Sequence, residues 1–190
     1  RLTMWPWEHA AFGYLCYSPL LHIARHRGPD GRAAALLLVG AVVPDAVDKT
    51  LSWGLGVFPT GYAVGHSVFV AVPLGAALLW VRWSDATLAF VVGYWSHLVG
   101  DVLDPLRYGD APAVTRTLYP VVVGEPYAED LGVGRGAVYL TEFLRELPGT
   151  DLTSPAAVYL LLPAIAVLLW LADGAPGTAL CRRFVTAIAE

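Results

Sequence analysis

Residues 86–103 read ATLAFVVGYWSHLVGDVL, an apolar stretch whose ionisable side chains are His97 and Asp101. As a helix it would be about 27 Å long, close to the ~30 Å hydrocarbon core of a bilayer. Four other stretches are similarly apolar, approximately residues 8–23, 33–49, 64–82 and 154–172. We therefore predict an all-α fold, an integral membrane helical bundle of about five transmembrane helices, with residues 1–190 in a single domain.

The composition of the whole chain supports this prediction. Hydrophobic residues make up 56% of the 190 residues and charged residues only 15%, against roughly 25% charged in an average soluble domain. Disordered chains need low hydrophobicity and high charge, so disorder is excluded. The net charge of -4 and the lack of a basic stripe argue against a nucleic-acid partner. A buried all-helical soluble bundle is the alternative for the same segments.

Basic residues predict how the helices are oriented. They follow the first, third and fifth apolar stretches: Arg25, Arg27, Arg32, Arg82, Arg182 and Arg183. In an alternation of five spans these positions share one side, and positive charge marks the cytoplasmic side. We expect a cell-membrane protein with its C-terminus in the cytoplasm and its N-terminus outside. Residues 105–153 would form a long outer segment, whose part GAVYLTEFLREL (136–147) predicts either an interfacial amphipathic helix or a plain solvent-facing helix.

Ionisable side chains occur inside four of the predicted spans, where they are costly and point to function. They are His9 in the first span, Asp45 and Asp48 in the second, His66 in the third, and His97 and Asp101 in the fourth. Counted along each helix from its cytoplasmic end, all six lie roughly 17–24 Å up, which places them in one layer. Imidazoles and carboxylates on facing helices suit zinc, manganese or iron. The sequence therefore predicts a metal site in the outer half of the membrane.

The same residues carry a family resemblance. The motifs are EHAAFGY (8–14), VVPDAVDK (42–49), GHSVF (65–69) and YWSHLVGDVLDP (94–105). In this order they resemble the membrane-bound, metal-dependent hydrolases related to the LexA-regulated bacterial protein YdjM. The order of His and Asp residues is also similar, more loosely, to the metal motif of zinc-dependent phospholipase C and P1-type nuclease. These resemblances imply hydrolysis of a phosphoester.

Roles for individual residues follow from the resemblance and the predicted layer. The expected metal ligands are His66, His97, Asp101 and Asp45, with His9 completing that set or binding a second ion. We expect one or two divalent ions, zinc first, with manganese or iron as alternatives. Asp48, one turn from Asp45, is the candidate general base or second bridging ligand.

Three other residues near the predicted layer have two interpretations each. Asp104 is a second candidate catalytic carboxylate, although its position before Pro105 also suits a helix end. Lys49 and Arg107 are expected to bind an anionic headgroup, or else to extend to the interface.

Together these expectations predict a metal-dependent hydrolase. A metal-activated water would attack a phosphoester in a lipid or lipid-linked substrate, because a site at this depth is better reached from the lipid phase. The alternative is a non-catalytic membrane protein with a structural metal or polar cluster, or a small ion or solute transporter.

Overall fold

The computed structural model describes residues 3–146 and 157–179. Its α-helices are α1 (Pro6–Arg25), α2 (Gly31–Lys49), α3 (Val68–Val81), α4 (Asp85–Leu103), α5 (Arg135–Glu146) and α6 (Val158–Ala172). Shorter helical turns are η1 (Thr50–Gly54), η2 (Asp104–Tyr108), η3 (Val114–Thr117) and η4 (Gly132–Gly134). No strand occurs in the described residues, and the predicted all-α class is confirmed.

Local sequence signals set where the long helices begin. Pro6 opens α1, a position where its missing N–H is not needed. The side chains of Asp30, Ser67 and Ser84 accept hydrogen bonds from backbone N–H groups in the first turns of α2, α3 and α4. Each cap satisfies a donor that has no partner within its helix.

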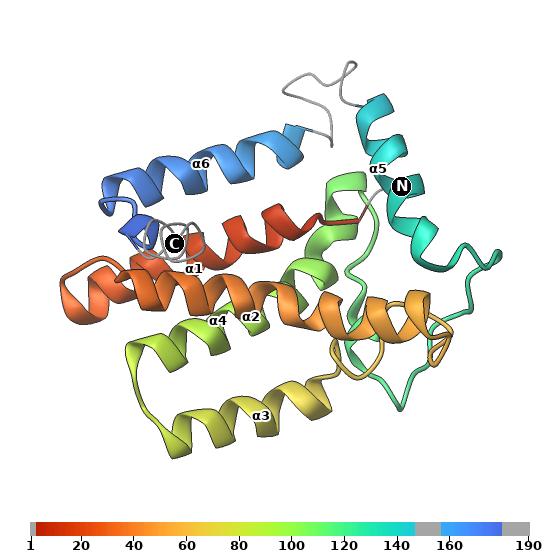
Figure 1. Ribbon diagram of the computed structural model, residues 1–190, viewed down its shortest axis with the longest axis horizontal. Coiled ribbons are helices and arrows are strands. Elements are labelled where there is room, and N and C mark those ends of the chain that lie inside the picture. The colour runs from red at the N-terminus through yellow and green to blue at the C-terminus, as the bar shows by residue number, and fades with distance from the viewer. Residues whose placement is uncertain (1–2, 147–156, 180–190) are drawn as a thin grey trace, which may run out of the picture.

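The centre of the bundle is the contact between α2 and α4 (Figure 1). A Cβ atom at Gly40 would lie 2.2 Å from the carbonyl oxygen of Phe90, and one at Gly93 would lie 2.3 Å from that of Leu37. Only glycine fits at these two positions, so the two backbones touch directly. This close approach brings the polar residues at the ends of α2 and α4 within reach of one another.

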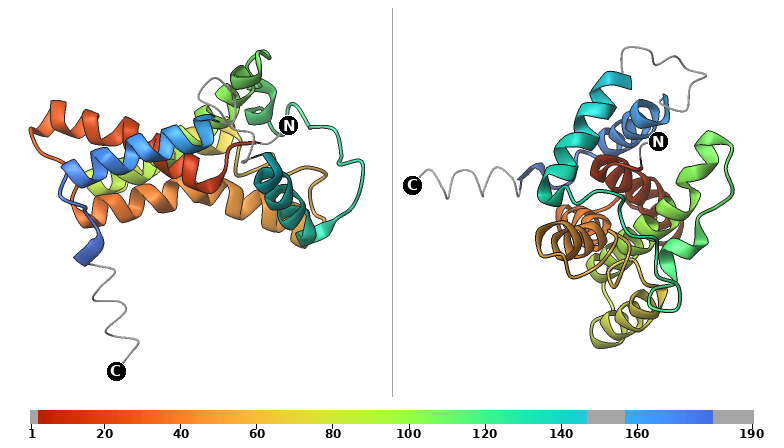
Figure 2. Two further views of the ribbon diagram at one scale, coloured as in Figure 1. Left: turned by 90° about the horizontal axis from the view of Figure 1, so that it is seen from above. Right: turned by 90° about the vertical axis from the view of Figure 1, so that its right-hand side faces the viewer.

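The remaining helices surround this pair. α1 packs against α2 and α4, α3 packs against α4, and α6 packs against α1. α5 lies across the end of the bundle where α1 begins and α2 ends (Figure 2). The helix predicted in the outer segment is therefore present, and it lies over the end of the bundle that holds the polar residues.

The predicted bounds of three helices agree with the structure within two residues, namely α1, α2 and α4. α3 is the exception because it begins at Val68, so His66 lies in the loop before the helix and not inside the third predicted span. α6 is described from Val158. The predicted start of the last helix at residue 154 lies outside the described residues, as do Arg182 and Arg183.

The expectation of five membrane spans is not confirmed. Within the described residues, α4 and the turn η2 that continues it form one helix, Asp85–Tyr108, that is long and apolar enough to cross a membrane. It has 24 residues and a mean hydropathy of 1.3. The helices Val68–Val81 and Leu160–Ala172 are apolar but shorter. α1 and α2 have 20 and 19 residues, but both carry ionisable side chains of the site. The buried core helix of a soluble protein can have the same length and hydropathy.

A carboxylate fastens α6 to α1. Asp173, directly after α6, accepts hydrogen bonds from Tyr14 Oη at 2.7 Å and Ser18 Oγ at 2.6 Å, and it pairs with His22 Nε2 at 2.7 Å. The three α1 residues are four positions apart and so share one helical face. Burial raises the pKa of Asp173, but the hydrogen bonds from Ser18, His22 and Tyr14 outweigh burial and leave the pKa below its usual value.

Replacing Asp173 with asparagine should destabilise the fold by about 2 kcal/mol, since an amide cannot accept all three hydrogen bonds. A carboxyl whose pKa is lowered by folding stabilises the fold at pH values above its ordinary pKa of 3.8. This stabilisation is lost as the pH falls through the lower pKa that the carboxyl has in the folded protein. The difference in melting temperature between wild type and Asp173→Asn should therefore shrink below that pH. Glu142→Gln on the exposed face of α5 is the control, and an equal effect there would contradict the assignment.

Candidate metal centre

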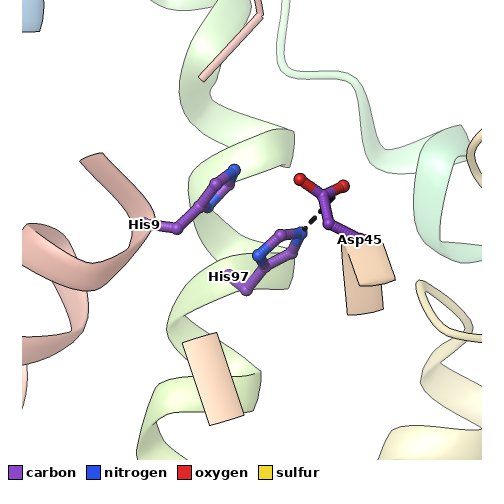
Figure 3. A group of neighbouring side chains, drawn as sticks. All are labelled: His9, Asp45 and His97. Carbon is purple, nitrogen blue, oxygen red and sulfur yellow. Dashed lines mark ion pairs between the residues drawn. The ribbon is translucent and has the colours of Figure 1, made fainter. Parts of the chain in front are cut away.

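The structure brings all five predicted metal ligands together. They are His9 on α1, Asp45 on α2, His66 in the loop before α3, and His97 and Asp101 on α4. Every one is buried, with at most 6% of its surface exposed. Figure 3 shows His9, Asp45 and His97 approaching one another from three different helices.

Four of these side chains present closely spaced ligand atoms, which we call the four-atom set. The Nε2 atoms of His66 and His97 are 3.1 Å apart. Asp101 Oδ2 lies 3.1 Å from the first and 3.4 Å from the second, and Asp45 Oδ1 lies 3.5 and 3.7 Å from them. Ligand atoms about 2.0–2.1 Å from a tetrahedral zinc ion are about 3.3 Å from each other. The two nitrogens and Asp101 Oδ2 therefore have the spacing of three ligands of one zinc-like ion, and Asp45 Oδ1 lies close to both nitrogens.

The outer nitrogen of each imidazole is occupied, which fixes the state of the inner one. His97 Nδ1 is 2.7 Å from the carbonyl oxygen of Ala41, which can only accept, so Nδ1 carries the proton. His66 Nδ1 is 2.8 Å from a carboxylate oxygen of Asp48, which holds the ring in the same way. In neutral rings both Nε2 atoms then present lone pairs to each other. At 3.1 Å either a proton or a metal ion must lie between the two nitrogens, and metal-binding histidines have such partners on their outer nitrogens.

Asp48 lies behind His66 and holds the loop that carries it. Besides His66 Nδ1, its carboxylate accepts the backbone N–H groups of Ala63 at 2.7 Å, Gly65 at 2.8 Å and His66 at 3.1 Å. A Cβ at Gly65 would lie 2.7 Å from the carbonyl oxygen of Pro44, so glycine allows the loop to reach α2. Four donors surround this fully buried carboxylate, an arrangement that suits orienting His66.

His9 lies on the other side of His97. The two rings stack with centroids 3.7 Å apart and planes 17° apart, and His9 Nε2 is 3.7 Å from Asp101 Oδ1. His9 Nδ1 is buried with no hydrogen-bond partner in the described part of the chain. His9, Asp45 and His97 form a second group that could hold an ion. His9 is thus placed beside the oxygen of Asp101 that the four-atom set does not use.

A pocket adjoins the cluster at Asp45. It has a volume of about 350 Å³ and lies between the start of α1, the end of α2 and α5. Lys49 lines it and forms an ion pair with Asp45 Oδ2, while Trp5, Trp53 and Tyr139 provide apolar walls. The pocket therefore combines one cation with aromatic surface, next to a carboxylate of the cluster.

Asp104 and Arg107 are buried together in a separate ionic group. Arg107 Nη2 is 2.6 Å from Asp104 Oδ1, and Arg107 Nη1 is 3.2 Å from Glu8 Oε1. Glu8 also accepts the backbone N–H of Trp5 at 2.8 Å, so this group joins the start of α1 to η2. Arg107 is not among the residues that line the pocket beside Lys49, and its binding to an anionic headgroup stays a prediction.

Two residues outside the predicted set, Tyr62 and Arg116, also lie beside the cluster. The Tyr62 ring packs edge-on against the His66 ring with centroids 4.9 Å apart. The Arg116 guanidinium lies 4.9 Å from the Tyr62 ring centre and donates a hydrogen bond to the carbonyl oxygen of Asp101 at 3.0 Å. Tyr62 lies in a loop and Arg116 in the short turn η3, and both segments are too short for periodicity to carry a signal.

Comparison with protein families identifies the family of this chain. Residues 4–176 match the model of a family described as YdjM inner membrane protein. No curated protein and no solved structure matches the chain. The matched range contains every residue of the cluster and, apart from Thr3, every residue that lines the pocket.

Proposed function

Since this chain belongs to the YdjM inner membrane protein family, we propose that it is an integral cell-membrane protein that hydrolyses a phosphoester in a lipid or lipid-linked substrate with a divalent transition metal. Zinc suits the mixed nitrogen and oxygen ligands best, and manganese and iron also fit. In this proposal the N-terminus and the site face outward and the C-terminus is cytoplasmic, as the arginine distribution predicts.

The observation that carries the proposal is the position of the four-atom ligand set beside the Lys49 pocket. A bound ion would lower the pKa of a coordinated water and polarise the phosphoryl group. His66, His97, Asp45 and Asp101 would hold that ion. Asp48 and the carbonyl of Ala41 orient the two imidazoles, so the ligands need little rearrangement.

Other residues of the chain bind and position the substrate in this proposal. The ammonium of Lys49 attracts the negatively charged phosphate at the mouth of the pocket. Trp5, Trp53 and Tyr139 pack against the apolar part of the substrate next to it. Arg116 and Tyr62 support Asp101 and His66 from the other side. A cation beside apolar walls suits a substrate that has both an anionic and an apolar part.

The test is a metal-dependent assay of the detergent-solubilised protein. The panel contains phospholipids, isoprenoid phosphates and generic phosphoesters, each measured with zinc, with manganese and after chelation. We expect turnover of at least one lipid phosphoester that chelation removes and metal restores. A complete lack of metal-dependent turnover by metal-loaded protein would contradict the hydrolase.

Replacing Lys49 with methionine should raise the KM for an anionic lipid substrate about 10-fold, the effect of losing one charged hydrogen bond. Lys49→Arg keeps the charge and is the matched control, so it should remain near wild type. The measurement is the steady-state rate against substrate concentration for the three proteins. Equal KM values for Lys49→Met and wild type would remove Lys49 from substrate binding.

A second candidate function is a structural metal that clamps the helices together. The burial of all five ligands favours it, because structural sites close their coordination sphere while catalytic sites keep one position open. Under this alternative, chelation would lower the melting temperature sharply and no substrate in the panel would be turned over. The same two measurements therefore separate the clamp from the hydrolase.

A further inference from the structure

A second hollow opens on the side of the bundle formed by α1, α2 and α6. Its volume is about 650 Å³, and its lining includes Trp7, Ala35, Leu38, Ala166 and Trp170. None of the described residues that line it carries an ionised side chain. The hollow is therefore a site for an apolar group, in contrast to the pocket that contains Lys49.

The two hollows follow one face of α2. Ala35 and Leu38 line the apolar hollow, whereas Val42, Ala46 and Lys49 line the pocket beside the metal centre. Steps of three and four residues place all five on one stripe of the helix. The stripe leads from apolar side chains directly to a cation.

Two aromatic residues at the start of α1 lie between the hollows. Trp5 lines the metal pocket and Trp7 lines the apolar hollow. Their rings stack with centroids 4.8 Å apart and planes 7° apart. The two hollows therefore lie next to each other along α2, with the stacked pair between them.

We propose that the apolar hollow binds the hydrocarbon chain of a long-chain lipid phosphate ester whose phosphate lies at Lys49. This inference rests on the proposed function and adds the part of the substrate that is bound. From Ala35 to Ala46 the stripe is about 17 Å long, close to the ~15 Å depth of one leaflet of a ~30 Å core. The cation at one end and the uncharged lining elsewhere match the charge distribution of such a lipid.

The exposure of the stripe agrees with a chain lying on it. Leu38 is 49% exposed and Val42 is 38% exposed, so both offer apolar surface that the described part of the protein leaves uncovered. Burying such surface is favourable in proportion to its area. A phosphoester with a short alkyl group would reach Lys49 and Val42 but would leave the hollow at Leu38 empty.

The experiment measures binding without turnover. Metal-loaded protein is mixed with hexadecyl phosphate that carries a photoactivatable diazirine at the far end of the chain, and cross-linked residues are located by mass spectrometry. We expect cross-links on α2 and α6 near Leu38 and Trp170. Unlabelled hexadecyl phosphate should compete with the probe, and butyl phosphate at the same concentration should not.

A variant pair tests whether the hollow itself is used. Ala35→Trp fills the hollow from an exposed position and should reduce cross-linking there at least 5-fold. Val72→Trp adds the same ring to α3, where Val72 is 56% exposed and outside both hollows, and should have no effect. Melting temperatures of both variants verify folding, and the competition experiment decides the matter if Ala35→Trp does not fold.

The two proposals can fail separately. Cross-links spread equally over α3, or equal competition by butyl phosphate, would mean that no chain is bound in the hollow, whether or not the protein is a hydrolase. Cross-links confined to α2 and α6 together with no turnover in the assay panel would keep the chain site and reject hydrolysis.

Discussion

Alanine in place of Asp101 should lower the metal affinity of the purified protein by roughly 100-fold or more. Losing a residue that only orients a ligand already costs 10–100-fold, and Asp101 Oδ2 lies 3.1 and 3.4 Å from the two inner imidazole nitrogens. Its other oxygen lies nearest to His9. Removing this carboxylate therefore affects every histidine of the cluster. Elemental analysis and competition with a metal-binding dye measure the loss.

The matched control for this experiment is a histidine far from the cluster. His26 is exposed and ends α1 with a φ of 54°, in the left-handed region. Asparagine tolerates that conformation better than alanine, so His26→Asn tests loss of an imidazole without backbone strain. It should bind metal like wild type. Normal metal content in Asp101→Ala, or no transition metal in the wild type after reconstitution, would reject the metal centre.

Much of the cluster could be predicted because ionisable side chains are conspicuous in apolar helices. His9, Asp45, His97 and Asp101 lie on regular helices, so a constant rise per residue places them at one level. The structure agrees, since these side chains come within pairing distance of one another. His66 joins them by a different route from the one expected. It precedes α3, and the loop anchored on Asp48 brings it to the same place.

The rest of the site depends on contacts made by short helical turns, which are too short to show a period in the sequence. Glu8 is adjacent to His9, yet its partner Arg107 belongs to η2 almost a hundred residues later. Arg116 reaches Asp101 from η3. Neither pairing changes the hydropathy of the chain, so composition could not reveal it. The two glycines that let α2 and α4 touch were likewise indistinguishable from other small residues of membrane helices.

The five membrane spans predicted from apolar composition are not confirmed by helix length and hydropathy. Apolar composition alone suggested five, but helices that carry the site's charges are less apolar than spans of equal length, and two others are short. Exposed apolar residues such as Val72, Trp80 and Leu168 still cover the outer faces of α3 and α6. Apolar surface of this kind is typical of a membrane or partner interface. The family match therefore carries the membrane assignment more firmly than helix length does.

Asparagine in place of Asp48 should cost both stability and metal affinity, and this outcome decides the role of that residue. An amide in this position keeps one acceptor and turns its other end, an NH₂ donor, toward a neighbouring donor. In the wild type the carboxylate accepts the N–H of Gly65 at 2.8 Å. If the amide oxygen of the variant stays with His66 Nδ1, the new NH₂ group faces this N–H, and two donors oppose each other. An unsatisfied buried donor costs about 1–3 kcal/mol, and the loop that carries His66 loses its anchor.

A general base would respond differently to the same substitution. It would lose turnover because an amide cannot take a proton at neutral pH, while metal content and melting temperature stayed close to wild type. We expect instead a lower melting temperature and a 10–100-fold weaker affinity for zinc, the usual cost of removing a ligand's orienting partner. The melting temperature, the zinc affinity and the turnover are all measured on the same preparation. Lost turnover with intact stability and metal content would assign Asp48 to proton transfer, whereas joint loss of stability and metal assigns it to holding His66 in place.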